Sequence, residues 1–310
     1  MRLVFMGTPD FAVPSLKRLA GSRHGIAGVV TVPDKPAGRG RALRASAVKR
    51  VALDLHLPVL QPENLKEAEF LSALREWKAD CYVVVAFRIL PPEVFGIPQY
   101  GAVNLHTSLL PKYRGAAPIQ WALMNGETET GVTTFLIDKN VDTGNILMQK
   151  RVPILPDEDA ECLHDKLADQ GADLLVETMN RLEEGTLAPR PQQGGTTPAP
   201  KIRPEHTRID WSEDCETLRN KVRALSPAPG AFAIWQGGRI KLFRAECVDP
   251  DRRPEKPGVV LRTGDEGIDV QCGTGVLRIS ELQLEGKKRM RAADFLRGNR
   301  IGPGDRLIPP

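Results

Sequence analysis

Residues 101–118 read Gly-Ala-Val-Asn-Leu-His-Thr-Ser-Leu-Leu-Pro-Lys-Tyr-Arg-Gly-Ala-Ala-Pro, and this stretch decides the fold. Its apolar beginning predicts a strand, and the proline and glycine that follow predict a turn into a helix. Residues two apart on a strand project from the same face, so Asn104 and His106 should point together while Leu105 enters the core. The pattern therefore predicts a carboxamide and an imidazole at one end of a sheet.

A carboxylate is expected beside this pair. The stretch Leu136-Ile-Asp-Lys-Asn-Val-Asp142-Thr-Gly144 contains the end of a second apolar strand and a turn with Asp142 at its mouth. An Asx turn ahead of Thr-Gly fits the same local sequence, and both roles are open to one residue. Asn104, His106 and Asp142 suit acyl transfer, in which N–H donors stabilise an oxyanion and a carboxylate orients the imidazole or takes a proton.

Apolar runs alternate with amphipathic helical patterns through the first half of the chain. Continuous apolar strands separated by helices are typical of a parallel sheet covered on both faces, so we expect an α/β, Rossmann-like domain. A long helix at about residues 159–184 should end this half. The expected strands lie at residues 3–6, 26–32, 82–87, 102–105, 131–137 and 146–152.

The second half begins after a segment rich in proline and glycine. Residues 188–206 hold five prolines and two glycines and predict a linker between domains. A helical pattern at 212–225 and short strand-like runs then indicate a small β-barrel. The predicted boundaries are 1–187 for a catalytic domain, 188–206 for the linker and 207–310 for the second domain.

Composition restricts the class of protein. The chain has 310 residues, of which 41% are hydrophobic and 26% charged, as is usual for globular proteins of two domains. The longest apolar run, residues 81–87, is too short to cross a bilayer, and the beginning of the chain lacks a signal-peptide pattern, so we expect a cytoplasmic protein. Five scattered cysteines without a Cys-x-x-Cys pair argue against a disulfide framework and a metal site, and predict mostly buried apolar side chains.

The positive charge is concentrated in the last third of the chain. Residues 201–310 hold 21 Lys and Arg against 16 Asp and Glu, a net of +5, whereas residues 1–200 hold 22 against 23, a net of −1. This asymmetry suits a polyanionic partner but is also common on ordinary domains. The two basic runs, residues 33–44 and 287–291, are either solvated loops or contacts to a phosphate backbone.

Two other catalytic motifs are absent from the sequence. The first turn, residues 7–14, has one glycine where the dinucleotide fingerprint needs three, which argues against a nicotinamide cofactor. Ser108 lies outside any nucleophile elbow and is expected to cap its own turn.

Four runs of the sequence resemble the folate-dependent formyltransferases: Asn104-Leu-His106-x-Ser108-Leu-Leu-Pro111, Tyr113-Arg-Gly-Ala-Ala-Pro-Ile-Gln120, Glu129-Thr-Gly-Val-Thr133 and Val141-Asp-Thr-Gly144. The resemblance covers nearly the whole chain. It implies an OB-like barrel as the second domain and transfer of a formyl group from 10-formyltetrahydrofolate to the amino group of initiator methionyl-tRNA. It also implies that Asn104, His106 and Asp142 are catalytic.

The same resemblance implies the binding residues. The 86–91 loop departs from the family pattern, because it has Arg88 where the family has a glycine and is one residue shorter. Folate contacts are expected at Phe87, Ile89, Leu90, Ser108, Leu109, Leu110 and Pro111. The tRNA contacts are expected at Arg39, Arg41, Arg44, Lys201, Arg203, Lys287, Lys288 and Arg289. The partners would be the folate co-substrate and the tRNA, and we expect a monomer without a metal.

Two other functions remain open. Formyltransferases that act on nucleotide-linked amino sugars share the Ser-Leu-Leu-Pro and Arg-Gly-x-Ala-Pro runs and a similar second domain. The arginine-rich loop at 38–44 and the Ile209-Asp-Trp211 entry to the second domain favour tRNA. A non-catalytic RNA-binding protein on this scaffold would have no physical need to keep Asn104, His106 and Asp142.

Overall fold

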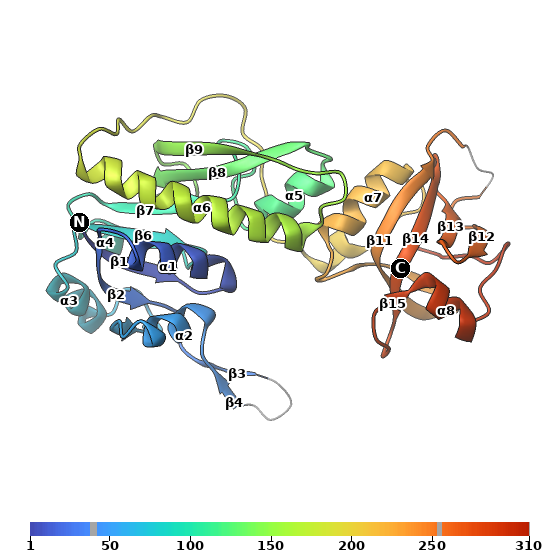
Figure 1. Ribbon diagram of the computed structural model, residues 1–310, viewed down its shortest axis with the longest axis horizontal. Coiled ribbons are helices and arrows are strands. Elements are labelled where there is room, and N and C mark those ends of the chain that lie inside the picture. The colour runs from blue at the N-terminus through green and yellow to red at the C-terminus, as the bar shows by residue number, and fades with distance from the viewer. Residues whose placement is uncertain (38–41, 253–255, 310) are drawn as a thin grey trace. The chain divides into compact units, whose positions relative to one another are not determined.

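The computed structural model describes residues 1–37, 42–252 and 256–309. Internal contacts divide the chain into two compact units, each assembled from separated segments. The first unit comprises Met1–Ala116, Glu129–Pro153 and His164–Ala199, and the second comprises Ala117–Thr128, Ile154–Leu163 and Pro200–Pro310. Each unit is described by itself below, with the element labels of Figure 1.

A seven-stranded sheet of order β5-β2-β1-β6-β7-β8-β9 forms the centre of the first unit. The first five strands of this order pair in parallel, whereas β8 is antiparallel to β7 and β9 is antiparallel to β8. The prediction of a parallel sheet is therefore wrong for the last two strands. Only residues 137–145 join β8 to β9, and a parallel crossover needs a dozen or more residues. The strands are β1 Arg2–Gly7, β2 Gly25–Val30, β5 Val59–Leu60, β6 Cys81–Val85, β7 Ala102–His106, β8 Glu129–Leu136 and β9 Ile146–Pro153.

Helices cover both faces of this sheet. Val4 and Tyr82 pack with Phe70 of α3 and Val94 of α4 on one face. Figure 1 shows α1 and α6 together over the opposite face of the sheet, where the hydroxyls of Thr134 of β8 and Thr178 of α6 lie 2.8 Å apart. The helical elements of this unit are η1 Asp10–Ala12, α1 Val13–Ala20, α2 Ala47–Asp54, α3 Ala68–Glu76, α4 Pro92–Phe95 and most of α6 Ala160–Glu183.

A short hairpin leads away from the sheet between β2 and α2. Its strands are β3 Lys35–Ala37 and β4 Ala42–Arg44 (Figure 1). The carboxylate of Asp34 anchors its base by accepting hydrogen bonds from Lys49 Nζ at 2.6 Å and Gln61 Nε2 at 2.8 Å. The ammonium of Lys49 therefore holds the base of the hairpin through Asp34.

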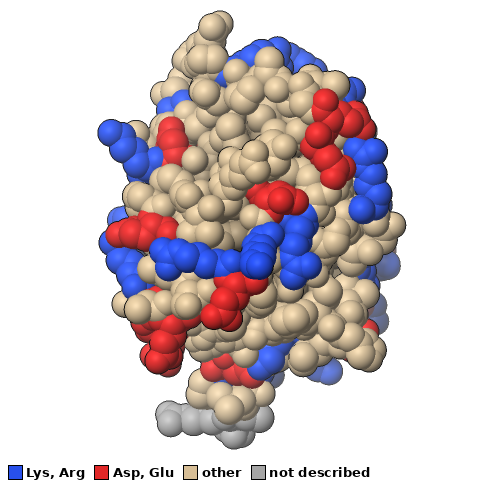
Figure 2. All heavy atoms as spheres, turned by 90° about the vertical axis from the view of Figure 1, so that its left-hand side faces the viewer, with Lys and Arg blue, Asp and Glu red and all other residues tan. Residues whose placement is uncertain are grey.

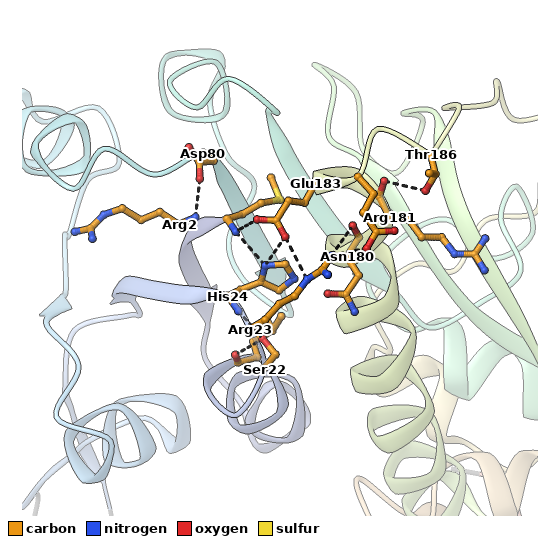
Figure 3. A network of polar contacts seen from close by, with 12 residues as sticks. Arg2, Ser22, Arg23, His24, Asp80, Asn180, Arg181, Glu183 and Thr186 are labelled. Carbon is orange, nitrogen blue, oxygen red and sulfur yellow. Dashed lines mark hydrogen bonds and ion pairs between the residues drawn. The ribbon is translucent and has the colours of Figure 1, made fainter.

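A polar network joins the start of β2 to the end of α6 (Figure 3). Glu183 accepts from the amino-terminal ammonium, which also lies 3.2 Å from Nδ1 of the buried His24. Arg23 donates to the carboxylate of Glu184 at 2.6 Å and lies 3.3 Å from that of Glu183. Burial lowers the pKa of His24, and the neighbouring ammonium lowers it further.

Charges of both signs are interspersed on the face of the molecule in Figure 2. Lys and Arg lie next to Asp and Glu across it. This face therefore offers no single-sign surface to a polyanion.

The second unit is the small antiparallel barrel that the sequence predicts. Its sheet has the order β10-β11-β14-β13-β12, and β15 pairs with β14. Residues 304–308 close it, because Ile308 bridges Ile234 of β10 while Arg306 bridges Val259 beside β12. The elements are α5 Pro118–Met124, η2 Pro204–Thr207, α7 Cys215–Ala224, β10 Ala231–Trp235, β11 Gly238–Asp249, β12 Val260–Gly264, β13 Gly267–Gln271, β14 Val276–Leu284, β15 Met290–Arg291 and α8 Ala292–Gly298.

Cysteine usage differs in part from the prediction. Cys81 and Cys272 are buried, as expected, and Cys162 is exposed. Cys215 and Cys247 form a disulfide that joins the start of α7 to β11. The spacing of 32 residues gave no sign of this pair, which only the packing of α7 against the barrel brings together.

None of the helices in the described ranges is long and apolar enough to cross a membrane.

Candidate active site

His106 and Asp142 meet at one end of the first unit's sheet. His106 is the last residue of β7, and Asp142 lies in the loop between β8 and β9. His106 Nδ1 is 3.8 Å from Asp142 Oδ2, and both side chains are about nine-tenths buried, with exposures of 8% and 10%. This distance suits an ion pair but exceeds that of a hydrogen bond.

A backbone carbonyl orients the imidazole. His106 Nε2 lies 2.8 Å from the carbonyl oxygen of Tyr113, which can only accept, so Nε2 carries the proton. In the neutral ring the lone pair is then on Nδ1, which faces Asp142. The sequence predicts that Asp142 orients the imidazole or takes a proton, whereas in the structure the carbonyl of Tyr113 holds the Nε2–H.

The loop around Asp142 is closely packed. Asp142 has a left-handed φ of 55°, and its Oδ2 accepts from the backbone N–H of Gly115 at 2.8 Å. A Cβ at Gly144 would lie 1.6 Å from the carbonyl oxygen of Leu136, so only glycine fits there. Asp138 makes the Asx-type bond in this loop by accepting from Asn140 N at 2.9 Å, which leaves Asp142 facing the imidazole.

The carboxamide of Asn104 has no polar partner among the residues that the structure describes. Asn104 is half-buried on β7, and within the described ranges its side chain makes no hydrogen bond. It shares the face of β7 with His106, because Leu105 between them points to α6, where a Cβ at Gly171 would lie 2.7 Å from Leu105 Cδ2. An amide donor is thus available to a ligand beside the His106–Asp142 pair.

Two residues that the sequence analysis missed hold the turn after β7. The hydroxyl of Thr133 donates to the carbonyl of Ser108 at 2.6 Å and accepts from Leu110 N at 3.2 Å. Gln149 Nε2 donates to the carbonyl of Leu110 at 3.0 Å. Thr133 and Gln149 are register partners on β8 and β9, and this pairing is visible only in the structure. Ser108 Oγ caps its turn by donating to the carbonyl of Lys112 at 2.5 Å, as predicted.

The predicted folate contacts differ in exposure. Ser108, Leu90 and Leu110 are buried, with exposures of 0%, 4% and 3%, so their side chains support the site from behind. Ile89 is 77% exposed. Phe87, Leu109 and Pro111 are half-buried. Arg88 donates to the carbonyls of Glu63 and Pro62 at 2.8 and 2.7 Å, and so ties the altered 86–91 loop to the loop before α3.

The predicted tRNA contacts are all exposed where they are described. Arg39 and Arg41 lie outside the described residues. Arg289 pairs with Glu281, and its guanidinium lies 4.8 Å from the ring centroid of Phe243. The other exposed members are Arg44, Lys201, Arg203, Lys287 and Lys288. No group of three or more potential metal ligands occurs in the part of the chain that the structure describes.

Comparison with known proteins identifies the family of this chain. The formyl transferase family model matches residues 1–179, and the model of the formyl transferase C-terminal domain matches residues 201–300. The methionyl-tRNA formyltransferase of Geobacter metallireducens is 46% identical over 313 residues, which cover 99% of this chain and 98% of that protein. The methionyl-tRNA formyltransferase of Caldanaerobacter subterraneus subsp. tengcongensis is 48% identical over 307 residues, with coverages of 98% and 99%.

Solved structures share the fold at lower identity. A sugar 3N-formyl transferase, WlaRD, has a TM-score of 0.68 at 19% identity and covers 93% of this chain and 99% of its own. The methionyl-tRNA formyltransferase from Clostridium thermocellum has a TM-score of 0.55 at 17% identity, with coverages of 89% and 100%. At these identities the likeness establishes the fold alone. The sequence matches over both halves carry the assignment, and the chain belongs to the formyl transferase family.

Proposed function

We propose that the protein transfers the formyl group of 10-formyltetrahydrofolate to the amino group of initiator methionyl-tRNA, giving N-formylmethionyl-tRNA for translation initiation in the cytoplasm. The observation that carries the chemistry is the His106–Asp142 pair, 3.8 Å apart, on the same sheet end as an unengaged Asn104 carboxamide. Nearly full-length relatives of 46% and 48% identity that are methionyl-tRNA formyltransferases support the substrate.

The residues around the site suit a formylated folate. A flat heterocycle needs apolar side chains and a few polar groups to bind. Two exposed apolar side chains supply such surface. Ile89, in the loop after β6, is 77% exposed, and Val141, which directly precedes Asp142, is 53% exposed. The unengaged Asn104 amide supplies a donor. Bound there, the folate would present an already activated formyl group, so positioning carries much of the rate.

Each polar group of the site has a role that its contacts allow. Asn104 donates its N–H to the formyl oxygen as negative charge develops on it, a kind of contact worth about 3 to 4 kcal/mol in comparable acyl-transfer sites. His106 accepts the proton of the attacking amine at Nδ1, because its Nε2 proton is held by Tyr113. Asp142 then stabilises the imidazolium as its ion-pair partner. The bond between the formyl carbon and the folate nitrogen breaks, and the imidazolium returns the proton to that nitrogen, so that tetrahydrofolate leaves as the amine. No covalent intermediate on the protein is required, and all three groups come from one chain, so a monomer suffices.

Contacts to tRNA are proposed at exposed basic side chains of both units. Arg44 lies on the β3–β4 hairpin opposite Lys35, so two cations face each other across its base. Lys201 and Arg203 precede η2, and Lys287, Lys288 and Arg289 lie between β14 and β15. Cations of this kind bind phosphates without reading bases. We propose the same role for Arg39 and Arg41, which lie outside the described residues.

The alternative within the family is an amino sugar as acceptor, since the fold is shared with a sugar 3N-formyl transferase. The test incubates the protein with 10-formyltetrahydrofolate and either methionyl-tRNA or a nucleotide-linked amino sugar, and mass spectrometry measures the formyl addition of each. Formylmethionine on the tRNA with no formylated sugar is expected. Formylated sugar alone would overturn the tRNA assignment, and no product with either acceptor would leave the non-catalytic reading.

A further inference from the structure

The segment between α6 and the second unit is bound along the active-site loops. Its backbone pairs with Ile146 through Arg190, with N···O distances of 2.8 and 2.9 Å. Thr197 Oγ1 accepts from the backbone N–H of Tyr113 at 2.8 Å, and Ala199 N donates to the carbonyl of Arg114 at 2.7 Å. Composition predicts a linker here, yet residues 190–199 touch both loops that carry the site.

Gln192 lies at the centre of this segment and uses every face of its amide. Nε2 donates to the carbonyl oxygens of Asp142 and Gly144, both at 2.9 Å. Oε1 accepts from Arg114 Nε at 3.0 Å and Nη2 at 2.6 Å. The carboxamide thus bridges the two loops, with its donors on the Asp142 turn and its acceptor on the arginine that precedes Gly115.

We propose that Gln192 is a positioning residue that holds the Asp142 carboxylate at its place against His106, with Arg114 as its support. A non-glycine residue in the left-handed region persists only when its surroundings hold it, and Asp142 has a φ of 55°. The two hydrogen bonds from Gln192 hold the carbonyl groups of Asp142 and Gly144, at the two ends of the turn that contains Asp142. The hydrogen bond from Gly115 N holds the carboxylate of Asp142 itself. Arg114 connects these contacts, because it precedes Gly115 in the chain and donates to Gln192.

Only an amide satisfies these contacts. A glutamate at position 192 would keep the pairing with Arg114 but direct a carboxylate oxygen at two carbonyls, which cannot donate. An asparagine is one methylene shorter than the present side chain. Gln192 contacts no reacting atom, so its effect on the reaction must pass through Asp142. The inference rests on the catalytic role proposed for Asp142.

The first test is steady-state formylation by Gln192→Ala. We expect kcat to fall by about ten- to a hundredfold, as for a misplacement of about 1 Å, with KM for methionyl-tRNA and for the folate unchanged. Gln192→Glu should fail to restore kcat. Gln193→Ala is the matched control, because Gln193 is the exposed neighbour and should retain the wild-type rate. An unchanged kcat for Gln192→Ala, or a loss confined to KM, would overturn the proposal.

The decisive test combines Gln192→Ala with Asp142→Asn. If Gln192 acts through Asp142, the double variant is no slower than Asp142→Asn alone. Independent, multiplicative losses would mean a merely structural role and overturn the inference. A wild-type rate for Asp142→Asn would instead sink the proposed catalytic role. The stoichiometry of folate binding measures the fraction of each variant that has a folded site. If Gln192→Ala does not fold, Arg114→Ala takes its place in the same cycle, since it removes the support of Gln192 and must give the same non-additivity.

Discussion

Asn104 differs from its neighbours in the site because its side chain has no hydrogen-bond partner among the described residues. His106 is held by the Tyr113 carbonyl and Asp142 by Gly115 N, whereas the Asn104 carboxamide makes no hydrogen bond within the described residues. A half-buried donor without a partner contributes little to the stability of the fold. Removing it should therefore affect catalysis and leave folding nearly unchanged.

Substituting Asn104 with Ala should lower kcat by about a hundred- to a thousandfold, the usual effect of losing one oxyanion donor. The free energy of unfolding should stay within about 0.5 kcal/mol of wild type, as for substitutions that break no contact. Asn104→Asp is the matched control, because it keeps the size of the side chain but has no N–H. A rate near wild type for Asn104→Asp would contradict the role as donor.

At this scale the sequence predicts what lies on one strand and misses what comes from far along the chain. Asn104 and His106 follow from alternation on β7, and Asp142 follows from its place at a strand end. Gln192 lies 50 residues from Asp142, with which it bonds. No local pattern relates two such positions, and the composition around Gln192 predicts a segment without contacts.

Among the elements, the link between the start of β2 and α6 depends on an uncharged histidine. Burial is the largest cause that lowers the pKa of His24, and the ammonium beside it acts in the same direction, while Glu183 opposes them. In the unfolded chain His24 has its ordinary pKa of about 6.5. Below this pH the unfolded chain therefore binds a proton at His24 that the folded chain does not bind. This contribution to stability is therefore complete above pH 6.5 and declines as the pH falls below it.

Substituting His24 with Gln should flatten the loss of unfolding free energy between pH 7 and about pH 5, measured by denaturant unfolding. Glu183 does not interfere in this range, because its carboxylate has a lowered pKa and loses its contribution only below its ordinary value of about 4.5. The exposed His56, changed to Asn, should leave the slope as in wild type. A slope unaltered by His24→Gln would show that another group titrates.

The β3–β4 hairpin gives a second test among the elements. Arg44→Ala should weaken methionyl-tRNA binding and reduce the slope of log K against log salt by about one, because one phosphate contact releases about one counterion. Arg75→Ala on α3 removes an exposed arginine outside the hairpin and should leave the slope unchanged. Equal slopes for Arg44→Ala and wild type would exclude a phosphate contact at Arg44.

Helices and strands with strong periodicity are found where the sequence predicts them. The direction of a strand in the sheet does not follow from that periodicity. The prediction places β8 and β9 correctly along the chain and assigns them the wrong direction, since the apolar pattern of a buried strand is the same in either direction. The disulfide between Cys215 and Cys247 was missed for the same kind of reason. Pairing depends on which elements pack together, and spacing does not report it.

For the molecule as a whole, the charge asymmetry seen in the sequence does not coincide with the two units. Residues 201–310 carry a net of +5, but the second unit also contains Ala117–Thr128 and Ile154–Leu163, which carry −5, so that unit is neutral overall and the first carries +4. Exposed cations that bind phosphates raise affinity without telling one tRNA from another.

The double variant Lys287→Ala, Lys288→Ala should raise the Kd of initiator and elongator methionyl-tRNA by the same factor, with a smaller factor at higher salt. Binding titrations at two salt concentrations measure it. Lys256→Ala with Arg262→Ala removes the same charge from other exposed positions of the unit and should have less effect. A loss restricted to the initiator tRNA would mean that Lys287 or Lys288 reads its identity.

The acceptor that pins the His106 ring is a main-chain atom, and this has a consequence for engineering. Alanine scanning across residues 110–118 leaves the oxygen of Tyr113 in place, so such a scan would not register its importance. Tyr113 has a φ of 58°, and the path of the backbone, more than any one side chain, aims that oxygen. A designer who grafts Asn104 and His106 onto another sheet would also have to transfer this turn. Without it, no acceptor would fix the orientation of the histidine ring.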